Sequence, residues 1–159
     1  MKLHHFTMAL VAGTLALQAA PCQGVSMTVR SPDGVAGYAC EPFQCLPEKF
    51  LADAGGMLDC EVYGRRGTFF VMLGGMPTIG CTPVAGFDGM LALGSPVFTL
   101  GYGGVSDYSA TTDCGLGTGT MNFVVPGGAV GMAFRLQAVG YSTVDVGLAF
   151  SRAVEIHLR

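Results

Sequence analysis

The chain has 159 residues, of which 50% are hydrophobic and 12% are charged, and its formal net charge at pH 7 is −3. Because the balance is mildly acidic and the longest basic run is Arg65-Arg66, the composition argues against a nucleic-acid partner. The length fits one ordinary domain. No apolar segment approaches the roughly 20 residues that a membrane-spanning helix needs.

Residues 1–20 have the pattern of a secretory signal peptide. Lys2 gives a basic start, residues 6–17 form an apolar run, and Ala19 and Ala20 offer small side chains for cleavage. Cys22 raises the possibility of a lipoprotein, but a lipidation site needs a small residue where this chain has Pro21. We therefore expect a secreted or periplasmic protein with no membrane span after signal removal.

Residues 21–56 contain three of the six cysteines and several turn signals. Ser31-Pro-Asp-Gly34 is typical of a turn. Residues 47–54 could form one or two helical turns, because Pro47 would stand at the first helical position. We expect this segment to be a disulfide-pinned loop with a short helix, packed on the domain formed by residues 57–159.

The rest of the chain has the composition of a β-protein. Its glycines, 25 in the whole sequence, recur at turn-like sites between short apolar stretches. Such a series predicts an antiparallel β-sandwich of the immunoglobulin or fibronectin-III type. The clearest hairpin joins its strands through Gly64-Arg-Arg-Gly67. The expected strands are residues 25–30, 57–63, 68–73, 90–93, 96–102, 118–125, 131–140 and 147–158.

The last strand, residues 147–158, shows a two-residue period. Its even positions are apolar, except for Arg152, and its odd positions from Ser151 onward are largely polar. This period is typical of a strand with one face on a core. Arg152 interrupts it, so the strand either bulges there or lets the guanidinium reach the rim, and we favour the bulge. The residues expected to point inward are Leu148, Phe150, Val154, Ile156 and Leu158.

The two C-terminal strands also resemble a known family. The motif Phe134-x-Leu136-Gln137-Ala138, followed after a loop by Gly147-Leu-Ala-Phe-Ser-x-Ala153-x-Glu155-x-x-Leu158, resembles the C-terminal β-domain of secreted planctomycete-type bacterial proteins. Residues 67–73, Gly-Thr-Phe-Phe-Val-Met-Leu, are similar to that domain's opening strand. The family pattern has Asn where this chain has Arg152. The resemblance implies a β-sandwich and secretion, and it supplies no catalytic residue.

All six cysteines follow the expected cleavage site, which predicts disulfides in an oxidising compartment. Spacing alone does not choose among the possible pairings. A zinc site is disfavoured because no second matching cysteine pair is present and His157 is the one histidine outside the signal. The pairs that we expect are Cys40 with Cys45, Cys22 with Cys60, and Cys81 with Cys114.

Catalytic signals are weak. His157 stands at an outward position of the last strand, where a solvated residue is expected. Asp107, Asp113 and Asp145 lie in loops without the spacing of a calcium site or a facing pair of carboxylates. The glycine-rich residues 115–119 lack the lysine of a phosphate-binding loop. The methionines left after the signal are dispersed, as expected for core packing, and disfavour copper. We expect no enzyme activity and no cofactor.

The aromatic residues leave one alternative open. The chain has no Trp, and tyrosines on strands are commonly half-buried packing residues. Exposed, coplanar tyrosines on one sheet would instead favour a carbohydrate-binding module. The tyrosines concerned are Tyr38, Tyr63, Tyr102, Tyr108 and Tyr141.

The sequence therefore predicts a secreted, non-enzymatic binding or structural module. Its partner would be a cell-envelope protein or a polysaccharide, bound at loops such as residues 105–115 and 140–147. A carbohydrate-binding module is the first alternative. A small secreted hydrolase is the second, and it would need a pocket that holds one of the three loop aspartates beside another acid.

Overall fold

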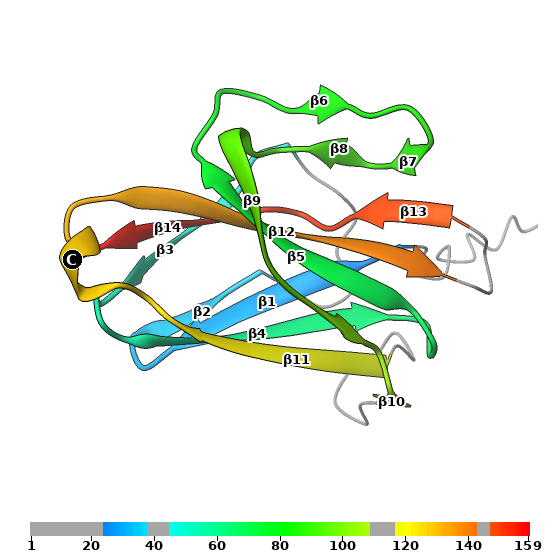
Figure 1. Cartoon of the computed structure of the whole chain (residues 1–159), viewed down its shortest axis with the longest axis horizontal. Coiled ribbons are helices and arrows are strands. Elements are labelled where there is room, and N and C mark those ends of the chain that lie inside the picture. The colour runs from blue at the N-terminus through cyan, green and yellow to red at the C-terminus, as the bar shows by residue number, and fades with distance from the viewer. Residues whose placement is uncertain (1–23, 38–44, 109–116, 143–146) are drawn as a thin grey trace, which may run out of the picture.

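The computed structural model describes residues 24–37, 45–108, 117–142 and 147–159, and it describes only the backbone of Asp107, Tyr108 and Ser142. These residues form two packed β-sheets with a smaller two-stranded sheet over one of them (Figure 1). The predicted all-β sandwich is confirmed. The immunoglobulin or fibronectin-III type stays a prediction.

The first sheet is centred on β4 (Met57–Gly64), which pairs with β1 (Ser26–Ser31) on one side and β11 (Gly117–Val124) on the other. The strands β2 (Gly34–Ala36) and β10 (Asp107–Tyr108) complete it. Leu58, Cys60 and Val62 are buried, whereas the intervening Asp59 is exposed. The two-residue period thus places one face of β4 against the core.

The second sheet is built around β12 (Ala133–Ser142). One edge of β12 pairs with β5 (Phe69–Met76), which in turn pairs with β9 (Gly94–Gly104). The other edge of β12 pairs with two strands in succession. Residues 139–142 pair with β13 (Gly147–Phe150), and residues 133–136 pair with β14 (Val154–Leu158). Two further pairings are parallel: β3 (Glu48–Ala52) with β14, and β7 (Phe87–Asp88) with β13.

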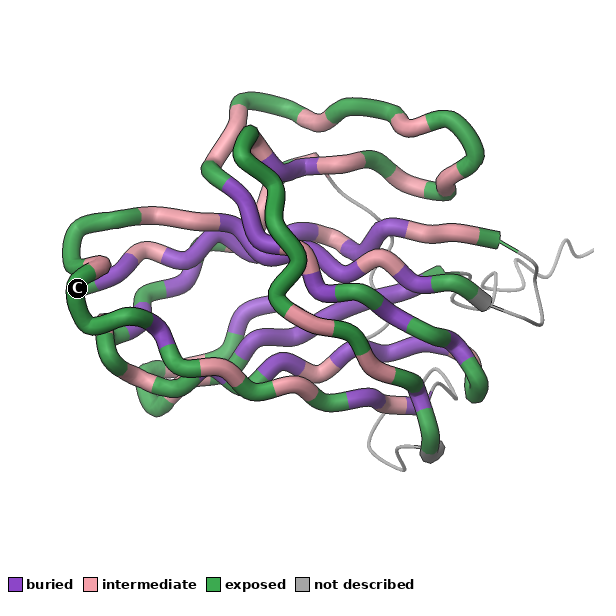
Figure 2. Tube along the Cα trace, in the orientation of Figure 1, coloured by how far each residue is buried: buried purple, intermediate pink, exposed green. Residues whose placement is uncertain are grey.

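The core lies between the two sheets (Figure 2). Its fully buried side chains come from both layers and include Leu58 and Val62 on β4, Phe70 and Met72 on β5, and Ile156 on β14. By burial alone, each such side chain contributes about 1.5–3 kcal/mol to folding.

Glycines let β9 approach the first sheet at the side of the sandwich. A Cβ at Gly119 on β11 would lie 2.5 Å from the carbonyl oxygen of Gly104 and 2.5 Å from the ring of Phe70. Because real Cβ atoms do not come so close, only glycine fits there. β9 therefore closes one side of the core.

The predicted interruption at Arg152 is a one-residue bulge. Leu136 pairs with Val154 and Val139 pairs with Phe150, so two residues of β12 lie opposite three residues, 151–153. The Ser151 hydroxyl accepts a hydrogen bond from the Ala138 amide at 2.9 Å. The sequence prediction of a bulge is thus confirmed.

The bulge also reverses which residues of β13 face the core. Val154, Ile156 and Leu158 point inward as expected, but Phe150 pairs with Val139 on the outer face and stacks on Phe87 at a centroid distance of 4.8 Å. Leu148 shares the outer face with Phe150, and Ala149 packs on the core instead. The inward placement expected for Leu148 and Phe150 was wrong because the extra residue shifts the two-residue period.

Two expectations for the first half of the chain were wrong. Residues 48–52 form β3, not a helix, because parallel pairing with β14 satisfies their backbone. Gly64-Arg-Arg-Gly67 joins β4 to β5 across the two sheets, not within a hairpin, because β1 and β11 already occupy both edges of β4. The described parts of residues 21–56 supply strands to both sheets and do not form a separate layer.

Candidate binding face

The outer face of the second sheet carries aromatic side chains on three neighbouring strands. Tyr141 on β12 pairs with Phe69 on β5, and Val71 on β5 pairs with Tyr102 on β9. Cross-strand partners point to the same side of a sheet. Since Phe70 is in the core, its neighbours Phe69 and Val71 point outward together with the two tyrosines. We call Phe69, Val71, Tyr102 and Tyr141 the aromatic face.

The aromatic face is open to solvent. The exposed fractions are 84% for Tyr102, 64% for Phe69, 41% for Tyr141 and 36% for Val71. Scattered single exposed apolar residues are common on proteins, but a contiguous group of them is typical of a binding surface. The four side chains carry no charge, so the face suits a neutral ligand with apolar surfaces.

The two tyrosines are separated by a distance set by the sheet. Their Cα atoms lie two strands and two residues apart in the register. With strand spacings of about 4.8 Å and a rise of about 3.3 Å per residue, the separation is roughly 12 Å. Phe69 lies between them on the middle strand. The arrangement is a platform long enough for an extended ligand to contact more than one ring.

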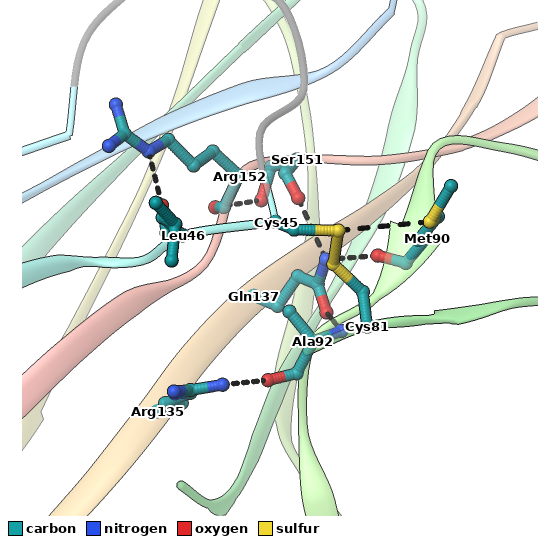
Figure 3. The surroundings of a disulfide bond; sticks show 9 residues. All are labelled: Cys45, Leu46, Cys81, Met90, Ala92, Arg135, Gln137, Ser151 and Arg152. Atoms are coloured by element: carbon teal, nitrogen blue, oxygen red, sulfur yellow. Dashed lines mark hydrogen bonds between the residues drawn. A yellow bond between two sulfur atoms is a disulfide. The ribbon is translucent and has the colours of Figure 1, made fainter. Parts of the chain in front are cut away.

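The other end of the same outer face is covered by residues 77–93, which we call the cover segment (Figure 1). It contains β6 (Thr82–Pro83) and β8 (Met90–Leu91), which pair with each other, and β7. Beneath it, the side-chain oxygen of Gln137 accepts a hydrogen bond from the Ala92 amide at 2.9 Å. The Gln137 amide donates to the carbonyls of Met90 and Ser151, both at 2.8 Å (Figure 3).

A disulfide between Cys45 and Cys81 ties the cover segment to the chain preceding β3, with a Cα–Cα distance of 5.6 Å (Figure 3). This pairing corrects the two expected bridges that involved these cysteines, Cys40–Cys45 and Cys81–Cys114. The sheet brings together cysteines 36 residues apart, which local spacing could not indicate.

Cys60 is the free cysteine among the cysteines that the structure describes, so its expected bridge to Cys22 was also wrong. Its side chain lies in the core on β4. Burial, together with the nearby charge of Asp59, raises the pKa of the thiol to about 12. Cys22, Cys40 and Cys114 lie outside the described residues.

A groove of about 450 Å³ lies beside the disulfide. On its floor, the Arg135 guanidinium donates to the Glu155 carboxylate from Nε and Nη2, each at 2.8 Å. Arg135 Nη1 donates to the Ala92 carbonyl at 2.9 Å (Figure 3). The other oxygen of Glu155 lies 2.9 Å from His157 Nε2 and 3.8 Å from Lys49 Nζ. Four ionisable side chains from β3, β12 and β14 thus meet on one face.

The sequence analysis did not predict this charged cluster, which consists of Arg135, Glu155, His157 and Lys49. His157 is half-buried and pairs with Glu155, so the expectation of a merely solvated residue missed its partner. The odd-numbered polar positions of the last strand were a signal for a shared face. The burial of these polar positions could not be predicted, because nothing in the sequence shows that the cover segment packs against this face.

The loop aspartates of the hydrolase alternative have no described side chains. Asp107 lies on β10, whose side chains are not described, and Asp113 and Asp145 lie outside the described residues. Tyr38 and the side chain of Tyr108 are outside them as well. Tyr141, in the predicted loop 140–147, belongs to β12.

The described residues lack two features, a metal-binding cluster and a membrane-spanning helix. They contain no group of three or more His, Cys, Asp or Glu side chains placed to hold a metal ion. Within the same part of the chain, no helix has the length and apolar character needed to cross a membrane.

Comparison with known proteins found a likeness to solved structures. No protein-family model and no curated protein matches the sequence. The crystal structure of a chitin binding domain from Burkholderia pseudomallei is similar to this chain with a TM-score of 0.42 and 14% sequence identity. The match covers 70% of this chain and 57% of that chain, so this chain spans little more than half of that protein's length.

Proposed function

We propose that this protein is an extracytoplasmic, non-enzymatic binding module and that its aromatic face binds a polysaccharide. The observation that carries the proposal is the exposure of Tyr102, at 84%, on the same sheet face as the exposed Phe69 and Tyr141. An enzyme would need convergent catalytic groups, and the aromatic face has none. It offers flat rings on a rigid support.

The chemistry of sugar rings fits this face. A pyranose ring presents a flat C–H surface that packs on an aromatic ring, while its hydroxyl groups at the rim stay in water. Tyrosine combines an apolar ring with a polar tip, so it contacts both parts. Because the rings stand on paired strands, little conformational entropy is lost when a ligand binds. Absence of charge at these four positions favours neutral sugar units.

The disulfide and the N-terminal signal pattern support the proposed location. A bridge such as Cys45–Cys81 persists in oxidising environments outside the cytoplasm. Polysaccharides of the cell envelope and the surrounding medium are available there. Secretion and polysaccharide binding are therefore consistent with each other.

A binding experiment tests the proposal. The protein would be mixed with insoluble cellulose, chitin, xylan and starch, and the bound fraction measured against protein concentration. We expect retention on at least one polymer, weakened about tenfold by Tyr102→Ala and similarly by Phe69→Ala, which corresponds to about 1.4 kcal/mol each. Val124→Ala is the matched control, because Val124 is 68% exposed on the other sheet.

Thermal unfolding would show that each variant is folded. Retention on no polymer would overturn the proposal. Equal weakening by Tyr102→Ala and Val124→Ala would overturn the assignment of the site.

A further inference from the structure

We propose that the groove beside the disulfide is a second binding site, independent of the aromatic face, for the carboxylate group of a ligand with an aliphatic body. One wall is residues 45–49 and the other is residues 77–80, and the floor is Arg135 and Glu155. We call this site the bridge groove.

The bridge groove has the size and rigidity of a small-molecule site. Its volume of about 450 Å³ lies in the range of roughly 300–1,000 Å³ that is usual for ligand pockets. The Cys45–Cys81 bond holds the two walls together. The first wall is fixed again where Arg152 Nε donates to the Leu46 carbonyl at 3.0 Å (Figure 3). A site whose walls are held in this way loses little entropy on binding.

The walls supply the surface for an aliphatic body. Leu46 on one wall is 77% exposed and Ile79 on the other is fully exposed. Pro47 and Pro77 add apolar surface beside them. A ligand seated between the walls would remove apolar area from water on both sides. This contribution is proportional to the area covered.

The charges on the floor favour an anion. The buried Glu155 carboxylate is compensated by the buried Arg135 guanidinium, which donates two hydrogen bonds to it. Lys49 adds a second positive charge, with 72% of its side chain exposed at the mouth of the groove. Arg135, Lys49 and Glu155 together carry one more positive charge than negative charge. A carboxylate placed against Lys49 would balance it.

The ionised state of the floor is maintained near neutral pH. Burial alone would raise the pKa of Glu155, but hydrogen bonds from Arg135 and His157 and the charges of Arg135 and Lys49 hold the pKa below its ordinary value. The Arg135–Glu155 pair therefore stays charged. Lys49 lies 3.8 Å from the other Glu155 oxygen, and its exposed side chain can also contact a ligand in the groove.

Hexanoate is the probe that tests the bridge groove. Titration followed by amide chemical shifts of the full mature protein should give saturable changes at Lys49, Thr78 and Gly80. Hexanamide, the neutral isostere, should bind at least about fivefold more weakly, and hexylammonium more weakly still. Galacturonate, a carboxylate without an aliphatic body, should bind more weakly than hexanoate, which separates an acidic sugar from an aliphatic acid.

Variants of Lys49 test whether its positive charge binds the carboxylate of hexanoate. Lys49→Gln should weaken hexanoate about fivefold and leave hexanamide unchanged, whereas Lys49→Arg should retain most of the affinity. Arg66→Gln is the control for losing one exposed positive charge elsewhere. Equal affinities for hexanoate and hexanamide, or equal effects of Lys49→Gln and Arg66→Gln, would overturn the proposal. Tyr102→Ala should leave hexanoate binding unchanged, so failure of one site is distinguishable from failure of the other.

Discussion

The outer face of the second sheet has two ends that differ sharply, although the same strand, β12, runs through both. At one end, Arg135 and Gln137 are buried beneath the cover segment, and backbone groups of that segment pair with both. At the other end, Tyr141 stands in solvent next to Phe69. A buried polar group needs partners, whereas a ring that stays in solvent contributes little to folding. The covered end therefore serves stability, and the open end is the one that we propose for binding.

The largest effect on stability is expected at Arg135, in the covered end. Arg135→Ala would leave the buried Glu155 carboxylate without its main partner. We expect a loss of about 3–5 kcal/mol in the free energy of unfolding. Chemical denaturation would measure it, with Arg66→Ala as an exposed control. A loss below about 1 kcal/mol would show that the covered end is not organised around this pair.

Removing the disulfide tests how the cover segment is held. The double variant Cys45→Ala with Cys81→Ala opens a loop closed across 36 residues. In the chain-entropy description, this costs about 3–4 kcal/mol. Guanidinium unfolding of the oxidised parent and the variant gives the difference. If the two unfold alike, the hydrogen bonds of Gln137 and Arg135 hold the cover segment by themselves.

A smaller effect is expected at Gln137. Gln137→Ala would remove three hydrogen bonds and leave the Ala92 amide without its side-chain acceptor. The expected loss is about 2 kcal/mol. Thr99→Ala is a matched control, because Thr99 lies in the same row of the sheet but is exposed on β9. Urea denaturation with similar results for both variants would contradict the importance of the covered network.

The smallest effect on stability is expected at the open end. Tyr102→Ala should change the free energy of unfolding by less than about 0.5 kcal/mol, as is usual for exposed positions. The same denaturation measurement checks it. A loss above about 1.5 kcal/mol would mean that the ring packs on the protein, and would remove the reason for assigning it to a ligand.

The sandwich could be predicted because its signal is local. Alternation along residues such as 57–63 and 154–158 indicates strands directly, and Arg152 at an apolar position marked the bulge. The pairing of β3 with β14, the crossing between β4 and β5, and the disulfide depend on contacts between distant segments. Local sequence patterns do not show which distant segments will contact each other. The resemblance to the planctomycete-type domain stays a prediction.

The candidate sites were harder to predict for a related reason. The sequence analysis included Tyr102 and Tyr141 among five candidate tyrosines. It could not show that these two share one sheet face, because that depends on the registers of β12, β5 and β9. Arg135 and Gln137 alternate with apolar residues, as Glu155 does in the last strand, and this two-residue period is that of an outer face. The period was interpreted correctly. It was the cover segment that turned part of the outer face into a second interior.

The reactivity of the Cys60 thiol can report on local opening of the first sheet. Buried on the central strand and with a pKa near 12, it is shielded from alkylating reagents as long as β4 stays paired. Every excursion that separates the sheets exposes it and restores ordinary thiol reactivity. The rate at which the peptide containing Cys60 gains the mass of iodoacetamide under native conditions therefore rises with the population of these open states, without any engineered probe.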